Sequence, residues 1–192
     1  MKKIVLASNN KHKIKEFKEI LNNYEILSLN DIDFHDDIEE NGNTFKDNAL
    51  IKAECIHNFL NSRNLDYIVV ADDSGLCCEG LDGLPGIHSA RFARDHDDQA
   101  NRDKLRKELK NKNRDAYFVC SIVVYYPNGD IKNYEGKTYG KIIDEEIGSK
   151  EFGYDCIFLS NDLNKTFGEA TEKEKNSVSH RKRAIELMLK DL

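Results

Sequence analysis

The chain has 192 residues, 35 of them acidic and 29 basic, so its formal net charge is −6. This length allows one large domain with a substantial core. The negative balance argues against a general nucleic-acid binder, because a phosphate backbone requires a positive face. No run approaches 18 apolar residues and no signal-peptide pattern opens the chain, so we expect no membrane association. Five cysteines without zinc-ligand spacing favour free thiols in a reducing cytoplasm.

Hydrophobic periodicity in the first part of the chain predicts strands and helices in alternation. In order, it predicts a buried strand over 3–7, a helix over about 12–22, a short strand over 25–29 and a helix over 45–61. Thr44 and Asp47 have capping-box spacing at the start of that second helix. The apolar run 67–71 then predicts a buried strand that ends at the adjacent Asp72 and Asp73, before a glycine-rich loop.

The second part of the chain predicts a hairpin between helices. In order, we expect a polar helix over about 97–111, strands over 116–126 and 131–140 joined by a Pro-Asn-Gly-Asp turn, and a further strand over 155–159. Thr171 and Glu174 form a full capping box, and Ser179 is expected to cap a last helix whose inward face includes Leu187. Parallel-type and hairpin-type strands together imply a mixed central β-sheet flanked by helices. The expected fold class is therefore α/β.

The paired carboxylates Asp72 and Asp73 are the most informative feature of the sequence. Open α/β sheets bind ligands at the carboxyl ends of their strands, and two neighbouring anions repel each other unless a cation lies close by. One interpretation is therefore a Mg²⁺-assisted site in which one of the two holds metal or activates water. The other is that Asp72 to Gly75 is simply a turn, since Asp, Ser and Gly are favoured turn residues.

Two polar segments suit the charges of a phosphorylated ligand. The first consists of Ser8, Asn9, Asn10, Lys11, His12 and Lys13. It offers backbone N–H groups and positive charge at a helix start, although it lacks Walker A spacing and is also explained as an ordinary N-cap. The second segment, Glu39-Glu40-Asn41-Gly42, suits the dipole of the helix that follows, but one of its acids with Asp73 would equally suit Mg²⁺.

Two further segments suit a purine base. Phe152-Gly153-Tyr154-Asp155 offers a ring for stacking, a glycine that allows close approach and a carboxylate that accepts ring N–H groups. Lys175 and the segment Ser177-Val178-Ser179-His180-Arg181 place donors at a helix start. Core aromatic residues and a solvated basic helix would explain each segment alone. Together with the phosphate and metal candidates, they indicate a nucleoside triphosphate site.

From Ile4 to beyond Arg183 the chain resembles the inosine triphosphatase family, the bacterial RdgB-like non-standard purine nucleoside triphosphate pyrophosphatases. The segments that carry the resemblance are 8–13, 39–45, 71–76, 84–91, 152–155 and 179–181. The chain departs from the usual family pattern at Ser8-Asn9, where Thr-Gly is common, at His88, where tyrosine is common, and at Cys156, where proline is common. None of these departures removes a group with an assigned chemical role.

The resemblance implies that residues 1–192 form a single inosine-triphosphatase-like domain with two lobes and an intervening substrate cleft. It implies Mg²⁺-dependent hydrolysis of ITP, dITP or XTP to the monophosphate and pyrophosphate. Asp73 would accept the proton and contact the metal, and Glu39, or alternatively Glu40, would complete the metal site. A cytoplasmic homodimer, with no nucleic-acid or membrane partner, is also implied.

The resemblance further implies which residues bind the substrate. Phe152 would stack on the base, and Asp155, His180 and Arg181 would read its edge. The full expected set is Ser8, Asn9, Asn10, Lys11, His12, Lys13, Ser74, Phe152, Gly153, Tyr154, Asp155, Lys175, His180 and Arg181. Two alternatives stay open at this point: a pyrophosphatase for pyrimidine or other modified nucleotides, and a non-catalytic nucleotide-binding sensor.

Overall fold

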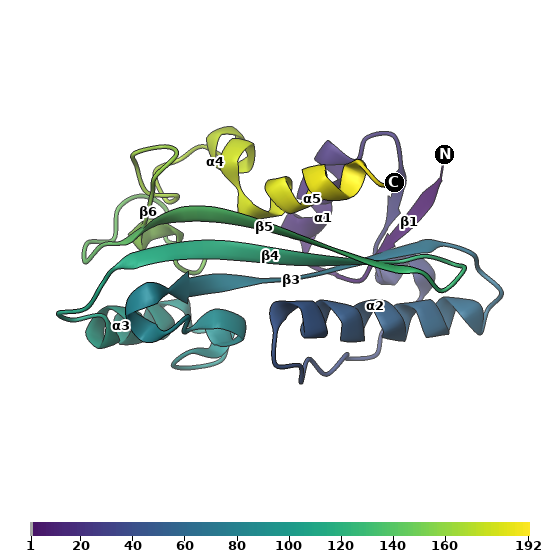
Figure 1. Ribbon diagram of the computed structural model, residues 1–192, viewed down its shortest axis with the longest axis horizontal. Helices are drawn as coiled ribbons and strands as arrows, with labels where there is room; N and C mark the ends of the chain where they lie inside the picture. Colours follow the sequence, from purple (N-terminus) through teal and green to yellow (C-terminus); the bar gives the residue numbers. More distant parts are fainter. Residues whose placement is uncertain (1) are drawn as a thin grey trace. The chain divides into compact units, whose positions relative to one another are not determined.

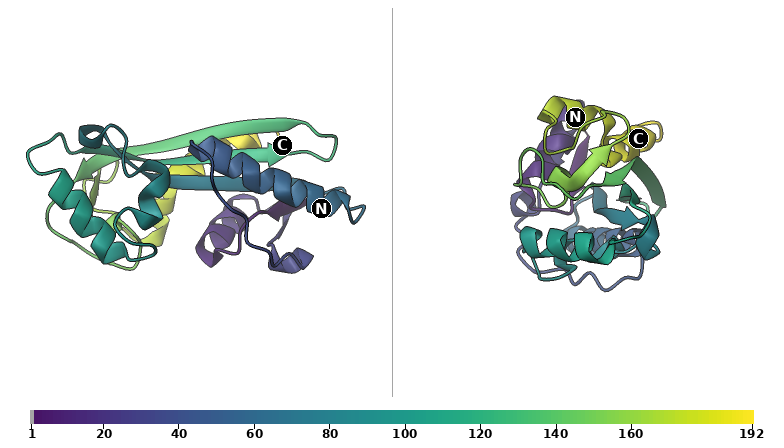
Figure 2. Two further views of the ribbon diagram at one scale, coloured as in Figure 1. Left: turned by 90° about the horizontal axis from the view of Figure 1, so that it is seen from below. Right: turned by 90° about the vertical axis from the view of Figure 1, so that its left-hand side faces the viewer.

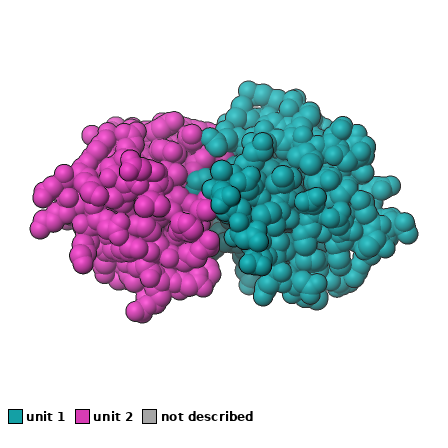
Figure 3. Space-filling model, turned by 60° about the horizontal axis from the view of Figure 1, so that its bottom comes forward, with its two compact units in different colours: residues 1–73, 121–135, 184–192 teal, residues 74–120, 136–183 magenta. Residues whose placement is uncertain are grey.

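The computed structural model describes residues 2–192, which divide into two compact units (Figure 3). Unit 1 consists of the chain up to Asp73 with Ser121–Glu135 and Ala184–Leu192, and unit 2 consists of Ser74–Cys120 and Gly136–Arg183. Each unit is therefore assembled from separate stretches of the sequence. The chain passes from one unit to the other after Asp73, Cys120, Glu135 and Arg183.

A six-stranded sheet runs through the molecule in the order β2-β1-β3-β4-β5-β6 (Figure 1). The strands are β1 (Lys3–Leu6), β2 (Glu25–Leu27), β3 (Ile68–Cys78), β4 (Asp115–Tyr125), β5 (Ile131–Ile142) and β6 (Phe158–Ser160). β1 pairs in parallel with both β2 and β3, whereas β5 and β6 are antiparallel. The sheet is mixed and is flanked by helices, which confirms the predicted α/β class.

Within residues 2–192, five α-helices accompany the sheet. They are α1 (Lys11–Ile20), α2 (Phe45–Asn61), α3 (Asp98–Glu108), α4 (Glu172–Val178) and α5 (His180–Leu189). Short 3₁₀ helices lie at Asn30–Ile32, Glu79–Leu81, Gly86–Arg91 and Asp155–Ile157. Among the described residues, none of the helices is long and apolar enough to cross a membrane.

The helices of unit 1 cover both faces of its part of the sheet. β1 lies between β2 and β3, so the connection through α1 and the connection through α2 run in opposite directions along the sheet. Right-handed crossovers therefore place α1 and α2 on opposite faces, as Figures 1 and 2 show. The apolar side of α2, with Ala49, Ala53 and Ile56 fully buried, packs in one cluster with Val5 and Val69.

Unit 2 has its own core around the other half of β3. Leu105 of α3 and Leu109, which caps the end of that helix, are fully buried and form one cluster with Leu76 of β3, Phe118 of β4 and Phe158 of β6. The ring of Phe118 contacts that of Phe158 edge-on, with centroids 4.7 Å apart. Such aromatic contacts add to the stabilisation that burial of apolar area already gives.

The prediction that a strand ends at the carboxylate pair was wrong. β3 continues from Ile68 through Asp72 and Asp73 to Cys78, and Leu76 and Cys78 are fully buried. The turn propensity of Asp-Asp-Ser-Gly is outweighed here by sheet pairing and burial, because β3 lies between β1 and β4. The last pair of residues that β1 shares with β3 is Leu6 and Val70, so the carboxylates still lie just beyond the parallel part of the sheet.

Most local predictions at element ends are confirmed. Thr44 accepts a hydrogen bond from the Asp47 amide, the Thr171 capping box is complete, and the Ser179 hydroxyl accepts one from the Lys182 amide at 3.0 Å. The predicted strand over 155–159 is instead a 3₁₀ turn followed by β6. In α5 the expected inward position of Leu187 is also wrong, since this side chain is exposed while Ile185 is buried.

Candidate active site

The two carboxylates of β3 are held by different helices of unit 1. Lys13 of α1 forms an ion pair with Asp72, with 2.9 Å between Nζ and Oδ2. Asn48 of α2 donates its side-chain N–H to Oδ2 of Asp73 at 3.0 Å. Successive residues of a strand point to opposite faces. The pair is thereby divided, since Asp72 faces the α1 side of the sheet and Asp73 faces the α2 side.

Asp73 lies in a setting that favours its protonated form more than water does. Burial raises the pKa of its carboxyl group, and the nearby charge of Glu40 raises it further. The positive charge of Lys52 and the hydrogen bond from Asn48 lower that pKa in part. A carboxylate whose pKa is moved toward neutrality is a better proton acceptor than an exposed one.

Side chains of α2 connect the acidic loop 39–42 to this carboxylate. Lys52 forms an ion pair with Glu40, with 2.8 Å between Nζ and Oε2. The Gly42 amide donates to the side-chain oxygen of Asn48 at 2.9 Å, and the same Asn48 amide group holds Asp73. The loop is therefore positioned relative to Asp73 by two polar residues one helical turn apart.

The carboxylates around Asp73 would suit a Mg²⁺ ion that is bound jointly by the protein and by the phosphates of its substrate. Within residues 2–192, no three His, Cys, Asp or Glu side chains gather as a preformed metal cluster. Mg²⁺ is nevertheless commonly held by one or two carboxylates, completed by waters and substrate phosphates. Glu39 is exposed, whereas Glu40 is close enough to raise the pKa of Asp73. These contacts favour Glu40 over Glu39 as the second acidic ligand.

The predicted phosphate segment is ordered by its own side chains. Asn10 caps α1 and accepts hydrogen bonds from the amides of His12 and Lys13 at 3.0 and 3.2 Å. Ser8 accepts one from the Asn10 amide at 3.1 Å, and Asn9 accepts one from the Asn30 amide at 3.2 Å. Two amides at the helix start are thus bound to the cap. Phosphate binding at this segment would depend more on lysine charge than on backbone donors.

Unit 2 brings several predicted base-binding residues into contact. The ammonium group of Lys175 forms an ion pair with Asp155, whose side chain is buried. The same ammonium lies 5.3 Å from the ring centroid of Phe152 and 5.6 Å from that of Phe167. Phe152 as a residue is 39% exposed. An exposed ring beside a cation and a carboxylate is a suitable surface for a stacked, hydrogen-bonded base.

The start of α5 contributes two more predicted residues in unit 2. His180 is buried, and its ring stacks on Phe118 with centroids 5.2 Å apart and planes inclined by 18°. Phe118 in turn stacks on Phe167, the ring over which Lys175 lies. Arg181 donates to the Ser74 hydroxyl at 3.5 Å. Ser74, His180 and Arg181 therefore belong to the same polar and aromatic region of unit 2 as Lys175.

Residues 4–191 match the model of the Ham1 family. The chain belongs to this family. Among its relatives, the dITP/XTP pyrophosphatase of Clostridium perfringens is 49% identical over 198 residues, which cover 100% of this chain and 97% of that protein. The dITP/XTP pyrophosphatase of Campylobacter jejuni is 44% identical over 189 residues, covering 96% and 94%. The structure of the Staphylococcus aureus Ham1 protein gives a TM-score of 0.87 at 40% identity, covering 97% of this chain and 96% of that one.

This Ham1-family chain also has site residues that its sequence did not single out. Asn48 and Lys52 lie four residues apart on α2 and are 2% and 9% exposed. Polar residues at that spacing, each directly before a buried alanine, were an available signal, because buried polar side chains need partners. Phe118, by contrast, reads as one more apolar residue of a strand. Nothing in the local sequence marks it as the ring under His180.

Proposed function

We propose that this chain hydrolyses non-standard purine nucleoside triphosphates, namely ITP, dITP and XTP, to the nucleoside monophosphate and pyrophosphate. The observation that carries the proposal is the half-buried Asp73, with its raised pKa, in contact with Asn48 and influenced by Lys52 and Glu40. Relatives named dITP/XTP pyrophosphatase, which match almost the whole chain, support this substrate class.

In the proposed reaction, Asp73 accepts a proton from the water that attacks the α-phosphorus. The bond from the α-phosphorus to the bridging oxygen breaks, and pyrophosphate leaves with that oxygen. Asp73 and Glu40 would hold Mg²⁺, which neutralises charge on the phosphates of the leaving group. Lys11, Lys13 and the other residues of the 8–13 segment would bind the triphosphate, and Lys13 would then serve both the phosphates and its ion-pair partner Asp72.

In the proposed mechanism, residues of unit 2 select the base. The base would stack on Phe152, while donors on His180 and Arg181 meet an oxygen at the 6-position. Hypoxanthine and xanthine carry such an oxygen, whereas adenine presents an amino group that would face these donors. A site built on polar pairing can reject the mismatched partner by about 10⁴–10⁵-fold, far more than a difference in shape allows.

We also propose that the enzyme is a cytoplasmic homodimer. All five cysteines carry thiols, as a reducing compartment would leave them. The apolar run of β4 is largely buried inside the sheet, with Ile122, Val123 and Val124 fully covered. A dimer surface would therefore have to use other residues.

A panel of triphosphates tests the function. ITP, dITP, XTP, ATP, GTP, CTP and UTP are incubated with and without Mg²⁺, and pyrophosphate is distinguished from orthophosphate in the products. We expect Mg²⁺-dependent pyrophosphate release that is fastest with ITP, dITP or XTP. Faster release from CTP or UTP would favour the pyrimidine alternative. Thermal stabilisation by ITP without any turnover would favour a sensor and contradict the proposal.

A further inference from the structure

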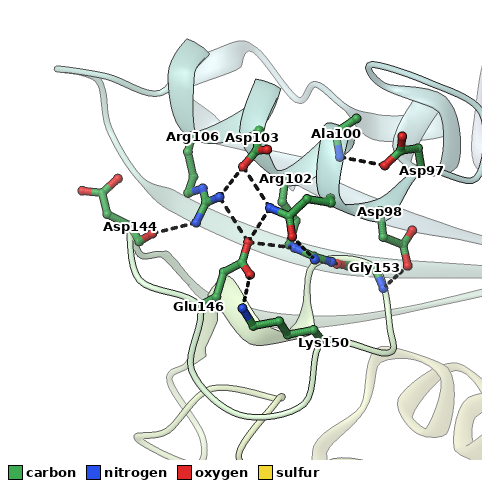
Figure 4. Close-up of polar contacts among 11 residues, drawn as sticks. Asp97, Asp98, Ala100, Arg102, Asp103, Arg106, Asp144, Glu146, Lys150 and Gly153 are labelled. Carbon is green, nitrogen blue, oxygen red and sulfur yellow. Dashed lines mark hydrogen bonds and ion pairs between the residues drawn. The ribbon is translucent and has the colours of Figure 1, made fainter.

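Both backbone polar groups of Gly153 are held by side chains of α3 in unit 2 (Figure 4). The Gly153 N–H donates to Oδ2 of Asp98 at 2.9 Å. Its carbonyl oxygen accepts from Nη1 of Arg102 at 2.7 Å. Asp98 and Arg102 lie four residues apart, and therefore on one face of the helix. We call this arrangement of Asp98, Arg102 and Gly153 the glycine clamp.

At Gly153, hydrogen bonds to the backbone have a large influence on the backbone conformation. Its φ of +42° lies in the left-handed region, which glycine enters freely and other residues rarely do. A Cβ built on Gly153 would meet no heavy atom within 4 Å, so packing does not hold this residue in place. The two hydrogen bonds fix the peptide planes on either side of it. They thereby set the direction in which the preceding residue, Phe152, leaves the backbone.

The arginine of the clamp is itself held firmly. The side chain of Arg102 is 3% exposed, and its Nε donates to Glu146 at 3.2 Å while Nη2 donates to Gln99 at 2.9 Å. Glu146 is also bound by Arg106 at 3.1 Å and by Lys150 at 2.9 Å (Figure 4). Every nitrogen of the Arg102 guanidinium thus has a fixed acceptor. Such a planar, multiply bonded group is suited to hold one carbonyl oxygen in one place.

We propose that Asp98 and Arg102 are positioning residues for base binding, acting through Gly153 to orient the ring of Phe152. The proposal rests on the proposed function, in which the base stacks on that ring. Neither residue is expected to touch the substrate. Loss of either contact would leave the phosphate-binding residues of unit 1 unchanged and would weaken only the part of binding that depends on the base.

The test compares Arg102→Leu with Arg106→Leu. Arg106 is a matched control because it binds the same Glu146 carboxylate but contacts the carbonyl of Asp144 instead of Gly153. We expect the KM for ITP to rise about tenfold in Arg102→Leu, a loss within the range that base–aromatic stacking contributes to binding. The inhibition constant of inorganic triphosphate should stay within about twofold of wild type, because this competitive inhibitor has no base to stack on Phe152. A general loss of binding would instead weaken the binding of both ITP and inorganic triphosphate.

The second residue of the clamp gives an independent pair of variants. Asp98→Ala should also raise the KM for ITP. Asp98→Asn should have a KM close to the wild-type value, since the amide oxygen can still accept from the Gly153 N–H. If the binding of ITP and the binding of inorganic triphosphate were weakened equally, the two residues would have a general structural role, and the proposal would be overturned. The same KM for ITP in Arg102→Leu and Arg106→Leu would also overturn it.

Amide hydrogen exchange of the segment 151–156 provides a reading that needs no activity. Exchange should be faster in Asp98→Ala and Arg102→Leu than in wild type and Arg106→Leu. If the wild-type enzyme releases no pyrophosphate from ITP, the proposed function is wrong, whereas unchanged exchange in both clamp variants shows that the clamp does not order the segment. The two failures are therefore distinguishable.

Discussion

Asp72 and Asp73 are neighbours in β3, yet each is bound from a different side of the sheet. Asp72 is almost fully buried and is paired with Lys13, whereas Asp73 is bound to Asn48 and influenced by the charges of Lys52 and Glu40. A carboxylate already neutralised by a lysine is poorly suited to take a proton from water. The division of the pair therefore supports different roles, with Asp73 as the proton acceptor and Asp72 as a partner that holds α1 against the sheet.

Asp73→Asn should separate these roles. We expect kcat for ITP to fall by about 10²–10⁴-fold, because asparagine keeps the shape and the hydrogen bond to Asn48 but cannot accept the proton. Asp72→Asn should instead lower the free energy of unfolding by about 1–3 kcal/mol, since it leaves Lys13 without a charged partner. Pyrophosphate release and thermal melting of the two variants measure both effects. Near-normal turnover in Asp73→Asn would remove it from the proton-acceptor role.

Arg181→Ala tests base reading at the start of α5. We expect the preference for ITP over ATP, measured as the ratio of kcat/KM values, to fall about tenfold or more, because a donor for the 6-oxo group is lost. Lys182→Ala is the matched control, being the next residue of the same helix but outside the proposed base site. An unchanged ratio in Arg181→Ala would exclude this residue from base recognition.

Whole elements act as supports for short functional segments in both units. α2 buries an apolar side in the core and uses Asn48 and Lys52 to position the acidic loop and Asp73. In unit 2, Leu105 of α3 packs in the core, while Arg102 of the same helix contacts Gly153 and Glu146. In each case a helix carries packing residues and positioning residues on adjacent turns.

Because of Glu146, the contribution of the α3 region to folding stability should depend on pH. The hydrogen bond from Lys150, with those from Gln99 and Arg102, lowers the pKa of Glu146 to about 2, from an ordinary value of 4.5. A carboxyl group whose pKa is lower in the folded state stabilises the fold at pH values above its unfolded pKa. That contribution is lost as the pH falls from the unfolded pKa of 4.5 toward the folded pKa of about 2. Glu146→Gln should therefore melt below wild type at pH 7, and the difference should shrink steadily between pH 5 and pH 3. A constant difference across this range would contradict the assignment.

For the molecule as a whole, features set by a few adjacent residues were predictable from the sequence. The capping box at Thr171 and the hairpin turn, where Gly129 has a φ of +91°, are encoded within four residues each. The path of β3 was not, because its turn-like residues are held extended by strands from elsewhere in the chain. The same holds for the contacts that shape the site, since Asn48 lies 25 residues from Asp73 and Arg102 lies 51 residues from Gly153.

Homodimer formation is a further prediction for the whole molecule. Light scattering coupled to gel filtration should give twice the 22.1 kDa mass of one chain over a range of micromolar concentrations. The control is the same measurement in about 1 M salt, which screens surface charge and leaves apolar contacts intact. A mass of one chain under both conditions would exclude a stable homodimer.

The continuation of β3 through Asp73 has a consequence for engineering this protein. A half-buried negative charge in the middle of a strand weakens the fold, and loss of hydration is the largest cause of the raised pKa of Asp73. Asparagine at this position removes the charge without changing the size of the side chain, so it should raise the melting temperature. A selection for heat resistance alone would therefore favour loss of activity at this position, since a residue that lowers stability is the one proposed to perform the chemistry.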